Sequence, residues 1–472
     1  MILKGTSHTV IGRRAIITLF LLPFAIFVSK AVTGASNYYL LLVMAAIVFF
    51  TVLTRFEFSL LLIGFTSYFL SYIIWLYDLP GPLINMGYAL IIMLLVRELF
   101  FTSGLTIVRT PINYILFAIV ALGFLSIAGG ESGVYPSLKG LLRHIGFPFL
   151  FILILLAEPD EKLMRKLIIG IIIIAFVQVI ASVLQFTWYS TIAPKPYGTR
   201  ADLSGGLLAF SCGGFTAVLM VMTFCLLMGF IIVKGLNLKL AVLTALTLVP
   251  IYLSSARAGV MLIAMSVFYM LIVAPLSKHG SLFNRILTAL SLYFLLLGAA
   301  LAGLGGQSFK EILNPQYAYD YSIKQSDSGM GRLQAFEVAE KELRNSIERL
   351  IGRGPGILTP TTVTENPNSL IASNPALFRN VTGYATTVIE LGYTGLVLFL
   401  LLYFQVFRFT RRFLRLIDDK FWESVALGFC GTIVIYVISA IYIDSWIFYP
   451  LPFTFWAIAA AIYRVGQIRG IF

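Results

Sequence analysis

Long apolar runs recur along nearly the whole chain, and they limit its fold more than any other feature. A helix needs about 20 mostly apolar residues to cross the hydrocarbon core of a bilayer. Stretches such as residues 167–174 are apolar without alternation, which is not the pattern of a membrane β-barrel. With 59% hydrophobic and only 12% charged residues, the 472-residue chain is not a soluble globular protein. The sequence therefore predicts an all-α polytopic membrane protein.

We expect about 12–14 transmembrane helices, because about that many runs approach the required length. The candidate spans are residues 14–32, 38–53, 58–77, 81–96, 112–128, 141–157, 167–188, 205–233, 238–254, 257–275, 286–305, 381–407, 423–443 and 447–464. Three of these are short (38–53, 81–96 and 141–157), and re-entrant or tilted segments are the alternative there. The first run follows basic residues and lacks a clear small-residue cleavage site, which indicates a retained signal anchor.

One long polar interval, residues 306–380, interrupts the apolar pattern and carries eight basic residues. The chain is therefore predicted to have three parts. They are N-terminal transmembrane helices at 1–305, a large loop at 306–380 and C-terminal transmembrane helices at 381–472.

Within the loop, residues 329–351 have apolar side chains at three- and four-residue spacing, which predicts one amphipathic helix. Asp327 and Ser328 are the expected cap residues before it. Gly352 and Gly354 are expected to end it.

The net charge of +13 indicates membrane topology rather than a nucleic-acid partner, because the basic residues cluster between apolar runs. With the N-terminus in the cytoplasm, the basic residues on the inner side are Arg55, Arg97, Arg109, Lys162, Arg165, Lys166, Lys234, Lys239, Lys278, Arg285, Arg411, Arg412, Arg415, Arg464 and Arg469. The short outer loops hold fewer. This bias predicts that both termini are cytoplasmic and that the 306–380 loop lies outside.

Two outer arginines do not follow from the positive-inside rule. Arg257 lies in the turn 253–259 among small residues, and Arg200 lies in the loop 197–206 with Asp202 close by. A guanidinium binds phosphate oxygens through two parallel hydrogen bonds, and small neighbours let a phosphate approach the backbone. Both residues are candidates for anion binding, and a snorkelling or salt-bridged structural arginine is the alternative.

Four other polar residues lie at predicted outer positions. Arg143 and His144 open a span, and the histidine is either structural or a proton carrier. Glu390 falls inside a span, where an unpaired carboxylate is costly, so an arginine partner is expected. Asp444 lies between the last two spans and is interpreted as a helix cap.

Several motifs are missing from the sequence. There is no phosphate-binding GxxxxGK[ST] loop, no HExxH or Cys/His cluster, and no outer Asp-x-Asp pair that would hold a divalent cation. All three cysteines lie in apolar runs, so neither a disulfide framework nor a thiolate metal site is expected. We expect no metal and no cofactor.

Five segments in order resemble a known family. They are Gly198-Thr-Arg200, Ser255-Ala-Arg-Ala-Gly259, Gly331-Arg332, Leu350-Ile-Gly-Arg-Gly-Pro-Gly356 and Val388-Ile-Glu-Leu-Gly-Tyr-Thr-Gly395. Their order and sidedness are similar to the O-antigen ligase and O-antigen polymerase superfamily of bacterial envelope glycosyltransferases. The likeness covers the chain from about Tyr197 onward, and the N-terminal spans match only in being hydrophobic.

The resemblance implies metal-independent, inverting glycosyl transfer at the periplasmic face of the bacterial inner membrane. The donor would be a saccharide on undecaprenyl pyrophosphate, with Arg200 and Arg257 holding the pyrophosphate. The general base would be Glu390, Asp202 or His144, and the sequence does not choose among them.

Further substrate contacts are expected from Arg143, Asp202, Arg332, Arg353, Arg379 and Tyr384, with solvated surface arginines as the alternative for the three in the loop. Membrane lipid is an expected partner, and a chain-length regulator and a flippase would accompany such an enzyme.

Ligases of this family carry a His-Asn pair shortly before the Glu-x-Gly-x-x-Gly segment, whereas Val381 and Thr382 lie near those positions here. The 306–380 loop contains no histidine. This difference favours a polymerase of O-antigen, capsule or exopolysaccharide type. The alternatives are an O-antigen ligase that transfers polymer to lipid A core or another acceptor, and a transporter or flippase for lipid-linked or anionic substrates. A single large outer loop is not typical of transporters.

Overall fold

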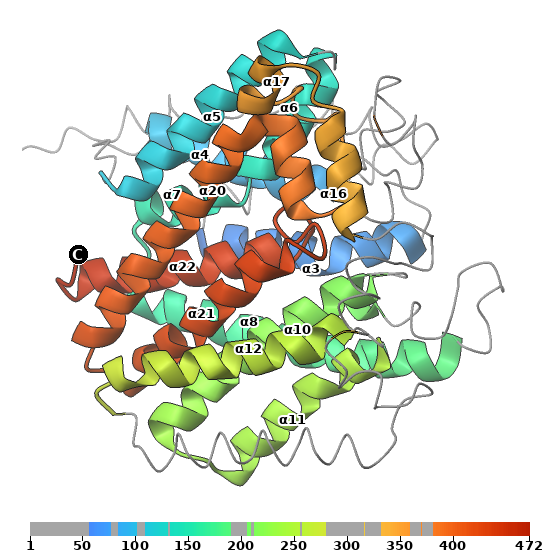
Figure 1. Cartoon of the computed structure of the whole chain (residues 1–472). Helices are drawn as coiled ribbons and strands as arrows, with labels where there is room; N and C mark the ends of the chain where they lie inside the picture. The colour runs from blue at the N-terminus through green and yellow to red at the C-terminus, as the bar shows by residue number, and fades with distance from the viewer. Residues whose placement is uncertain are drawn as a thin grey trace, which may run out of the picture. The chain divides into compact units, whose positions relative to one another are not determined.

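The computed structural model describes residues 56–76, 84–101, 109–130, 133–189, 205–208, 212–254, 257–279, 316, 332–358, 370 and 381–472. Every regular element in these ranges is helical, and no strand occurs there (Figure 1). The predicted all-α class is therefore confirmed. The predicted spans at 14–32, 38–53 and 286–305 lie outside the described residues.

The chain divides into two compact units, Met1–Ile107 and Val108–Phe472. The described part of the first unit consists of α3 (Phe56–Leu76) and α4 (Met86–Phe101), which pack against each other.

The second unit contains all the other described elements. They are α5 (Pro111–Gly129), α6 (Val134–Ile145), α7 (Pro148–Ala157), α8 (Glu161–Leu184), a π-helical turn η2 (Gln185–Tyr189), a short 3-10 turn η4 (Gly206–Leu208), α10 (Gly213–Lys234), α11 (Leu238–Leu253), α12 (Arg257–Val273), a second 3-10 turn η5 (Ala274–Leu276), α16 (Arg332–Lys341), α17 (Ser346–Ile351), α20 (Gly383–Leu416), α21 (Lys420–Ser439) and α22 (Leu451–Ile468).

Within the described ranges, six helices are long and apolar enough to cross a membrane. They are Phe56–Ile74, Pro111–Gly129, Glu161–Thr187, Gly213–Lys234, Gly383–Leu416 and Lys420–Ser439. This confirms a chain built from several membrane-compatible helices, and the larger number expected from the sequence stays a prediction. The apolar helix Leu238–Leu253 is shorter.

The segment predicted as a short span at 141–157 is a bent pair. Its two helices, α6 and α7, meet at an angle of 64° and together count as a seventh span if they form one crossing. Pro148 is the first residue of α7 and follows Gly146 and Phe147. Proline has no backbone N–H and so cannot donate the hydrogen bond that would continue α6 into α7, which explains the break at this point. The segment is therefore not a single straight helix.

The centre of the second unit is α10, whose residues are buried along its whole length by neighbouring helices. It crosses α21 at two glycines. A Cβ at Gly229 would lie 2.2 Å from the Ser424 carbonyl oxygen, and one at Gly428 would lie 2.6 Å from the Cys225 carbonyl oxygen. Small residues at such a crossing let two helix backbones approach closely, which is a common way to pack helices in membranes.

Ion pairs tie together the helix ends at one end of this unit. Arg165 of α8 lies 3.1 Å from Asp419, which precedes α21, and Arg469 after α22 lies 2.8 Å from Glu161. Lys278 after η5 donates to the carbonyl oxygen of Leu416, the last residue of α20. We call this region the basic end. Its arginines and lysine are among the residues that the charge pattern assigns to one side of the membrane.

Between residues 332 and 358, the described stretch of the long polar interval forms two short helices instead of the single helix predicted at 329–351. That prediction is wrong because Asn345 adopts extended backbone between α16 and α17, and its side chain caps α17 by accepting from the Glu348 N–H. Gly352 ends α17 as predicted, with φ of 80°. The expected cap residues Asp327 and Ser328 lie outside the described residues.

The helix α20 is broken near its start. Gly392 has φ of 70° and ψ of −179°, which separates a short first part, Gly383–Leu391, from the long remainder. α17 and the segment after it lie beside this break (Figure 1). From Gly392 to Leu416 at the basic end, a helix with a rise of 1.5 Å per residue extends about 36 Å.

Candidate functional site

Segments distant in sequence meet at the N-terminal end of α10, far from the basic end. We call residues Gly213–Ala217 the α10 head. The hydroxyl of Thr216 donates to the carbonyl oxygen of Gly205 at 2.8 Å. A Cβ added at Gly259, near the start of α12, would lie 3.3 Å from the Cβ of Ala217.

The turn between α21 and α22 reaches the same place. A Cβ at Gly214 would lie 3.4 Å from the Ile443 side chain, and the rings of Phe215 and Phe448 stack with centroids 3.8 Å apart. The backbone N–H of Gly383 at the start of α20 donates to Ile443. The α10 head thus lies between Gly205, Gly259 and Ile443, and Ile443 links it to the start of α20.

Two buried glutamines hold the turn at Gly205 and Gly206. The Gln185 amide exchanges two hydrogen bonds with the backbone of Gly206, each 2.6 Å long. Gln178 donates to Gly205 and accepts from the Leu207 N–H. The sequence reasoning missed both residues. Their signal was two glutamines, seven residues apart, in an apolar helix where an unsatisfied amide is costly.

His144 and Glu390 form a buried pair in the same half of the unit. His144 Nε2 lies 2.7 Å from Glu390 Oε2, and their side chains are 1% and 0% exposed. Among the described residues the ionisable side chain that contacts Glu390 is therefore His144 of α6, and not the arginine expected from the sequence. The other oxygen, Oε1, accepts the backbone N–H of Leu358 at 3.0 Å.

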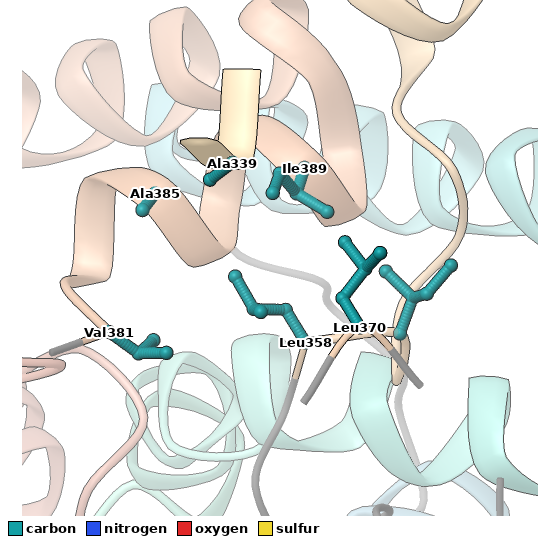
Figure 2. Close-up of a cluster of buried hydrophobic side chains, with 7 residues drawn as sticks. Ala339, Leu358, Leu370, Val381, Ala385 and Ile389 are labelled. Carbon is teal, nitrogen blue, oxygen red and sulfur yellow. The ribbon is translucent and has the colours of Figure 1, made fainter. Parts of the chain in front are cut away.

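The polar loop is fixed onto the first part of α20. The Arg353 N–H donates to the Ile389 carbonyl oxygen at 2.7 Å, close to the Leu358 bond. An apolar cluster anchors the segment that follows (Figure 2). Its buried members are Ala339, Ile357, Leu358, Leu370, Val381, Ala385 and Ile389. The loop motif around Gly352–Gly356 and the motif around Glu390 are thus in direct contact.

Asp444 lies buried in the turn between α21 and α22. Its Oδ2 accepts from the Thr386 hydroxyl of α20 at 3.0 Å, and its carboxylate interacts electrostatically with His144, Glu390 and Arg143. Burial raises the pKa of the Asp444 carboxyl to about 7. The predicted role of helix cap is wrong, because α22 begins after Pro450 and has no side-chain cap.

The turn that carries Asp444 is held rigidly. The Trp446 indole N–H donates to the Tyr436 carbonyl oxygen at 3.2 Å, and the Ser439 and Ser445 hydroxyls lie 3.0 Å apart. The Trp446 ring also packs edge-on against the Tyr384 ring. These contacts fix the position of the Asp444 backbone relative to α20 and α21.

The predicted substrate-binding residues differ in their surroundings. Arg143 is 7% exposed and lies beside His144 in α6. The Arg332 guanidinium, at the start of α16, lies 5.2 Å from the centre of the Tyr442 ring, two residues before Asp444. Tyr384 donates its hydroxyl to the Val437 carbonyl oxygen.

Arg353 is not a solvated surface arginine, so that alternative is wrong for it. It is 4% exposed, and its Nη1 lies 3.2 Å from Glu342 Oε2. Its guanidinium thus links the segment after α17 to the end of α16. This contact indicates a structural anchor for the loop.

The remaining predicted residues are covered only in part. Arg257 begins α12, as the predicted turn before a span requires, and its side chain is not among those described. Arg200, Asp202 and Arg379 lie outside the described residues.

Three buried polar atoms near this region have no hydrogen-bond partner among the described residues. They are Arg143 Nε, His144 Nδ1 and Asp444 Oδ1. Buried polar atoms are normally satisfied by protein, water or ligand. A guanidinium, an imidazole and a carboxylate together can bind an anionic or hydroxylated ligand and can move a proton. No protein family and no curated protein sequence matches the chain.

Proposed function

We propose that this protein is a glycosyltransferase that polymerises oligosaccharide repeat units carried on undecaprenyl pyrophosphate. The transfer is metal-independent and takes place at the periplasmic face of the bacterial inner membrane. One observation carries the proposal. The Gly205–Gly206 turn and the start of α12 contact the α10 head, and the start of α20 is linked to it through Ile443 of the α21–α22 turn, although these segments are far apart in sequence.

The pyrophosphate is assigned to Arg200 and Arg257. Arg257 starts α12 two residues before Gly259, which packs on the α10 head. Arg200 precedes the Gly205–Gly206 turn by five residues in the sequence. Preorganised positive charge near a water-excluded site stabilises the negative charge that develops as the glycosidic bond to phosphate breaks.

The polar interval 306–380 is assigned the role of a sugar-binding cover. Its described part is fastened to α20 by the Arg353 and Leu358 N–H groups and by the apolar cluster of Figure 2. Arg332 of this interval and Tyr384 at the start of α20 are assigned to the saccharide, because they offer a polar and an aromatic surface.

The proposed topology has about 12–14 spans, cytoplasmic termini and a periplasmic 306–380 loop, in keeping with the positive-inside bias. In a variant without the native cysteines, a cysteine at Ser328 should react with an impermeant reagent in intact cells. A cysteine at the exposed Asp418 of the basic end should react only after the cells are opened. The opposite pattern would overturn the topology.

The function is tested with purified protein and a lipid-linked repeat unit. Arg200→Ala and Arg257→Ala should each abolish polymer formation while leaving membrane insertion intact. Arg415→Ala is the matched control, because Arg415 is an exposed arginine near the basic end of α20. Normal polymer lengths in both site variants would contradict the proposal. Activity should also survive a chelator.

A ligase is the second candidate, and one observation favours it. Ligases of the family carry a His-Asn pair shortly before the segment that contains Glu390 here. The 306–380 loop of this chain has no histidine, but His144 of α6 lies beside Glu390. A strain lacking this protein distinguishes the two activities. Single repeat units on the carrier should accumulate if it polymerises, and carrier-linked polymer should accumulate if it ligates.

A further inference from the structure

Three carboxyl or imidazole groups in the candidate site could accept a proton, and their surroundings separate them. Glu390 is fully buried, and both of its oxygens are already engaged, by His144 and by the Leu358 N–H. His144 is 2% exposed, its Nε2 is held by Glu390, and its Nδ1 has no hydrogen-bond partner among the described residues. Asp444 is 7% exposed, and its Oδ1 has no hydrogen-bond partner among the described residues. Of the two carboxylates, Asp444 is therefore the one that keeps an oxygen without a partner among the described residues, and that oxygen is buried.

The position of Asp444 suits a group that must meet a substrate. It lies in a turn between two helices and not within an apolar span. The Thr386 hydroxyl donates to Oδ2 at 3.0 Å. This hydrogen bond fixes the orientation of the carboxylate, and therefore of its other oxygen, Oδ1. The turn itself is fastened by the Trp446 and Ser445 hydrogen bonds. A preorganised carboxylate with one engaged and one available oxygen is the arrangement that general base catalysis requires.

We propose that Asp444 is the general base that accepts the proton of the attacking sugar hydroxyl. This inference rests on the proposed function. The acceptor O–H bond breaks, and its proton passes to Asp444 Oδ1. The oxygen uses the released electron pair to bond to the anomeric carbon of the donor. The bond from that carbon to the pyrophosphate oxygen breaks, and its electron pair leaves with the pyrophosphate. Asp444 then returns the proton to water.

The charged neighbours of Asp444 support this role. The His144 and Arg143 side chains lower the cost of its ionised form, whereas burial and the Glu390 carboxylate raise that cost. The result is a carboxyl with a pKa of about 7, near the operating pH at which a base is most effective. The titratable and charged groups around it are His144 and Arg143 of α6, Glu390, Tyr384 and Tyr403 of α20, Tyr436 of α21, and Arg332 of α16.

The test compares Asp444→Asn and Asp444→Glu with the wild-type protein, using an undecaprenyl-pyrophosphate-linked repeat unit as donor. Donor binding and the transfer rate are measured separately across neutral pH. Asp444→Asn should bind the donor like the wild type, transfer at least about 100-fold more slowly, and lose the rise in rate with pH. Asp444→Glu should recover part of the rate with an altered pH profile. Asp160→Asn, an exposed cap residue of α8 whose capping oxygen is kept, is the matched control.

The two proposals fail in different ways. Wild-type protein that transfers no sugar from the pyrophosphate donor would refute the proposed function. Active wild type with an Asp444→Asn variant within about tenfold of its rate, and with the same pH profile, would refute the role of Asp444 alone. If Asp444 only supports the fold, Asp444→Asn should lower donor binding and rate together, and this outcome also counts against the base.

Discussion

Gly352 and Gly392 each have left-handed backbone, and each lies where a side chain would collide with the segment of the other. A Cβ at Gly352 would lie 2.4 Å from the Glu390 carbonyl carbon, and one at Gly392 would lie 2.1 Å from the Leu350 carbonyl oxygen. Both contacts are with backbone, which cannot move aside cheaply. This reciprocal fit seats the end of α17 in the break of α20 and holds Glu390 against His144.

Alanine at either glycine should therefore destabilise the protein. Gly352→Ala and Gly392→Ala combine a strained positive φ with a backbone clash, and we expect each to cost about 2–4 kcal/mol. Gly170→Ala is the control, because Gly170 is inside α8 and an added Cβ there would meet nothing within 4 Å. Alanine is the better helix former there and should be neutral or stabilise by up to about 1 kcal/mol. The free energy of unfolding in detergent is measured for all three variants. Equal values would contradict the close packing of Gly352 and Gly392 against backbone.

The buried pair of His144 and Glu390 should behave as one unit. His144→Leu or Glu390→Leu alone leaves a buried polar partner, and we expect each to cost about 3–5 kcal/mol. The double variant should cost clearly less than the sum of the two. The exposed pair Lys278 and Asp418, 3.5 Å apart, is the control, with an expected coupling below about 1 kcal/mol. Additive effects at the buried pair would show that the contact is not important for stability.

Helix positions were largely predictable from the sequence, because the bilayer requires long apolar runs separated by polar residues. The predicted spans 112–128, 238–254 and 257–275 agree closely with α5, α11 and α12. The prediction failed at residues 329–351, where spacing alone does not reveal a break. Asn345 prefers to accept a hydrogen bond from the N–H of Glu348 and so starts a new helix there.

The candidate site was predictable only in part, since its contacts join residues far apart in the chain. His144 and Glu390 are separated by 246 residues, so no local pattern indicates that they touch. Both were predicted as catalytic candidates, but their pairing was not. Asp444 was interpreted as a cap because an aspartate between two helices usually is one. Asp444 is buried by residues of α6 and α20, which are far from it in the sequence, so the local pattern gives no sign of its burial.

The two bonds between Gln185 and Gly206 should matter for stability and for activity. Gln185→Ala removes both partners of a buried backbone N–H and C=O, and we expect a loss of about 1–3 kcal/mol. If the Gly205–Gly206 turn positions the pyrophosphate site, the same variant should raise the KM for the lipid-linked donor more than it lowers kcat. Lys239→Ala, at an exposed position of α11, is the control. A stable Gln185→Ala protein with unchanged KM would argue against this positioning.

Asp444 should make the protein less stable as pH rises. An ordinary aspartate has a pKa near 3.8, and burial raises the pKa of Asp444 to about 7 in the folded state. Between these values the folded protein binds more protons than the unfolded chain, so the free energy of unfolding falls with rising pH across that interval. The penalty is complete above the folded pKa and is of the order of a few kcal/mol. Asp444→Asn cannot ionise, so above about pH 8 it should melt at a higher temperature than the wild type and near pH 4 at a similar one.

Asp160→Asn should not change the pH dependence. If Asp444→Asn melts at a lower temperature than the wild type above about pH 8, the ionised carboxylate stabilises the fold, which would contradict a pKa raised by burial.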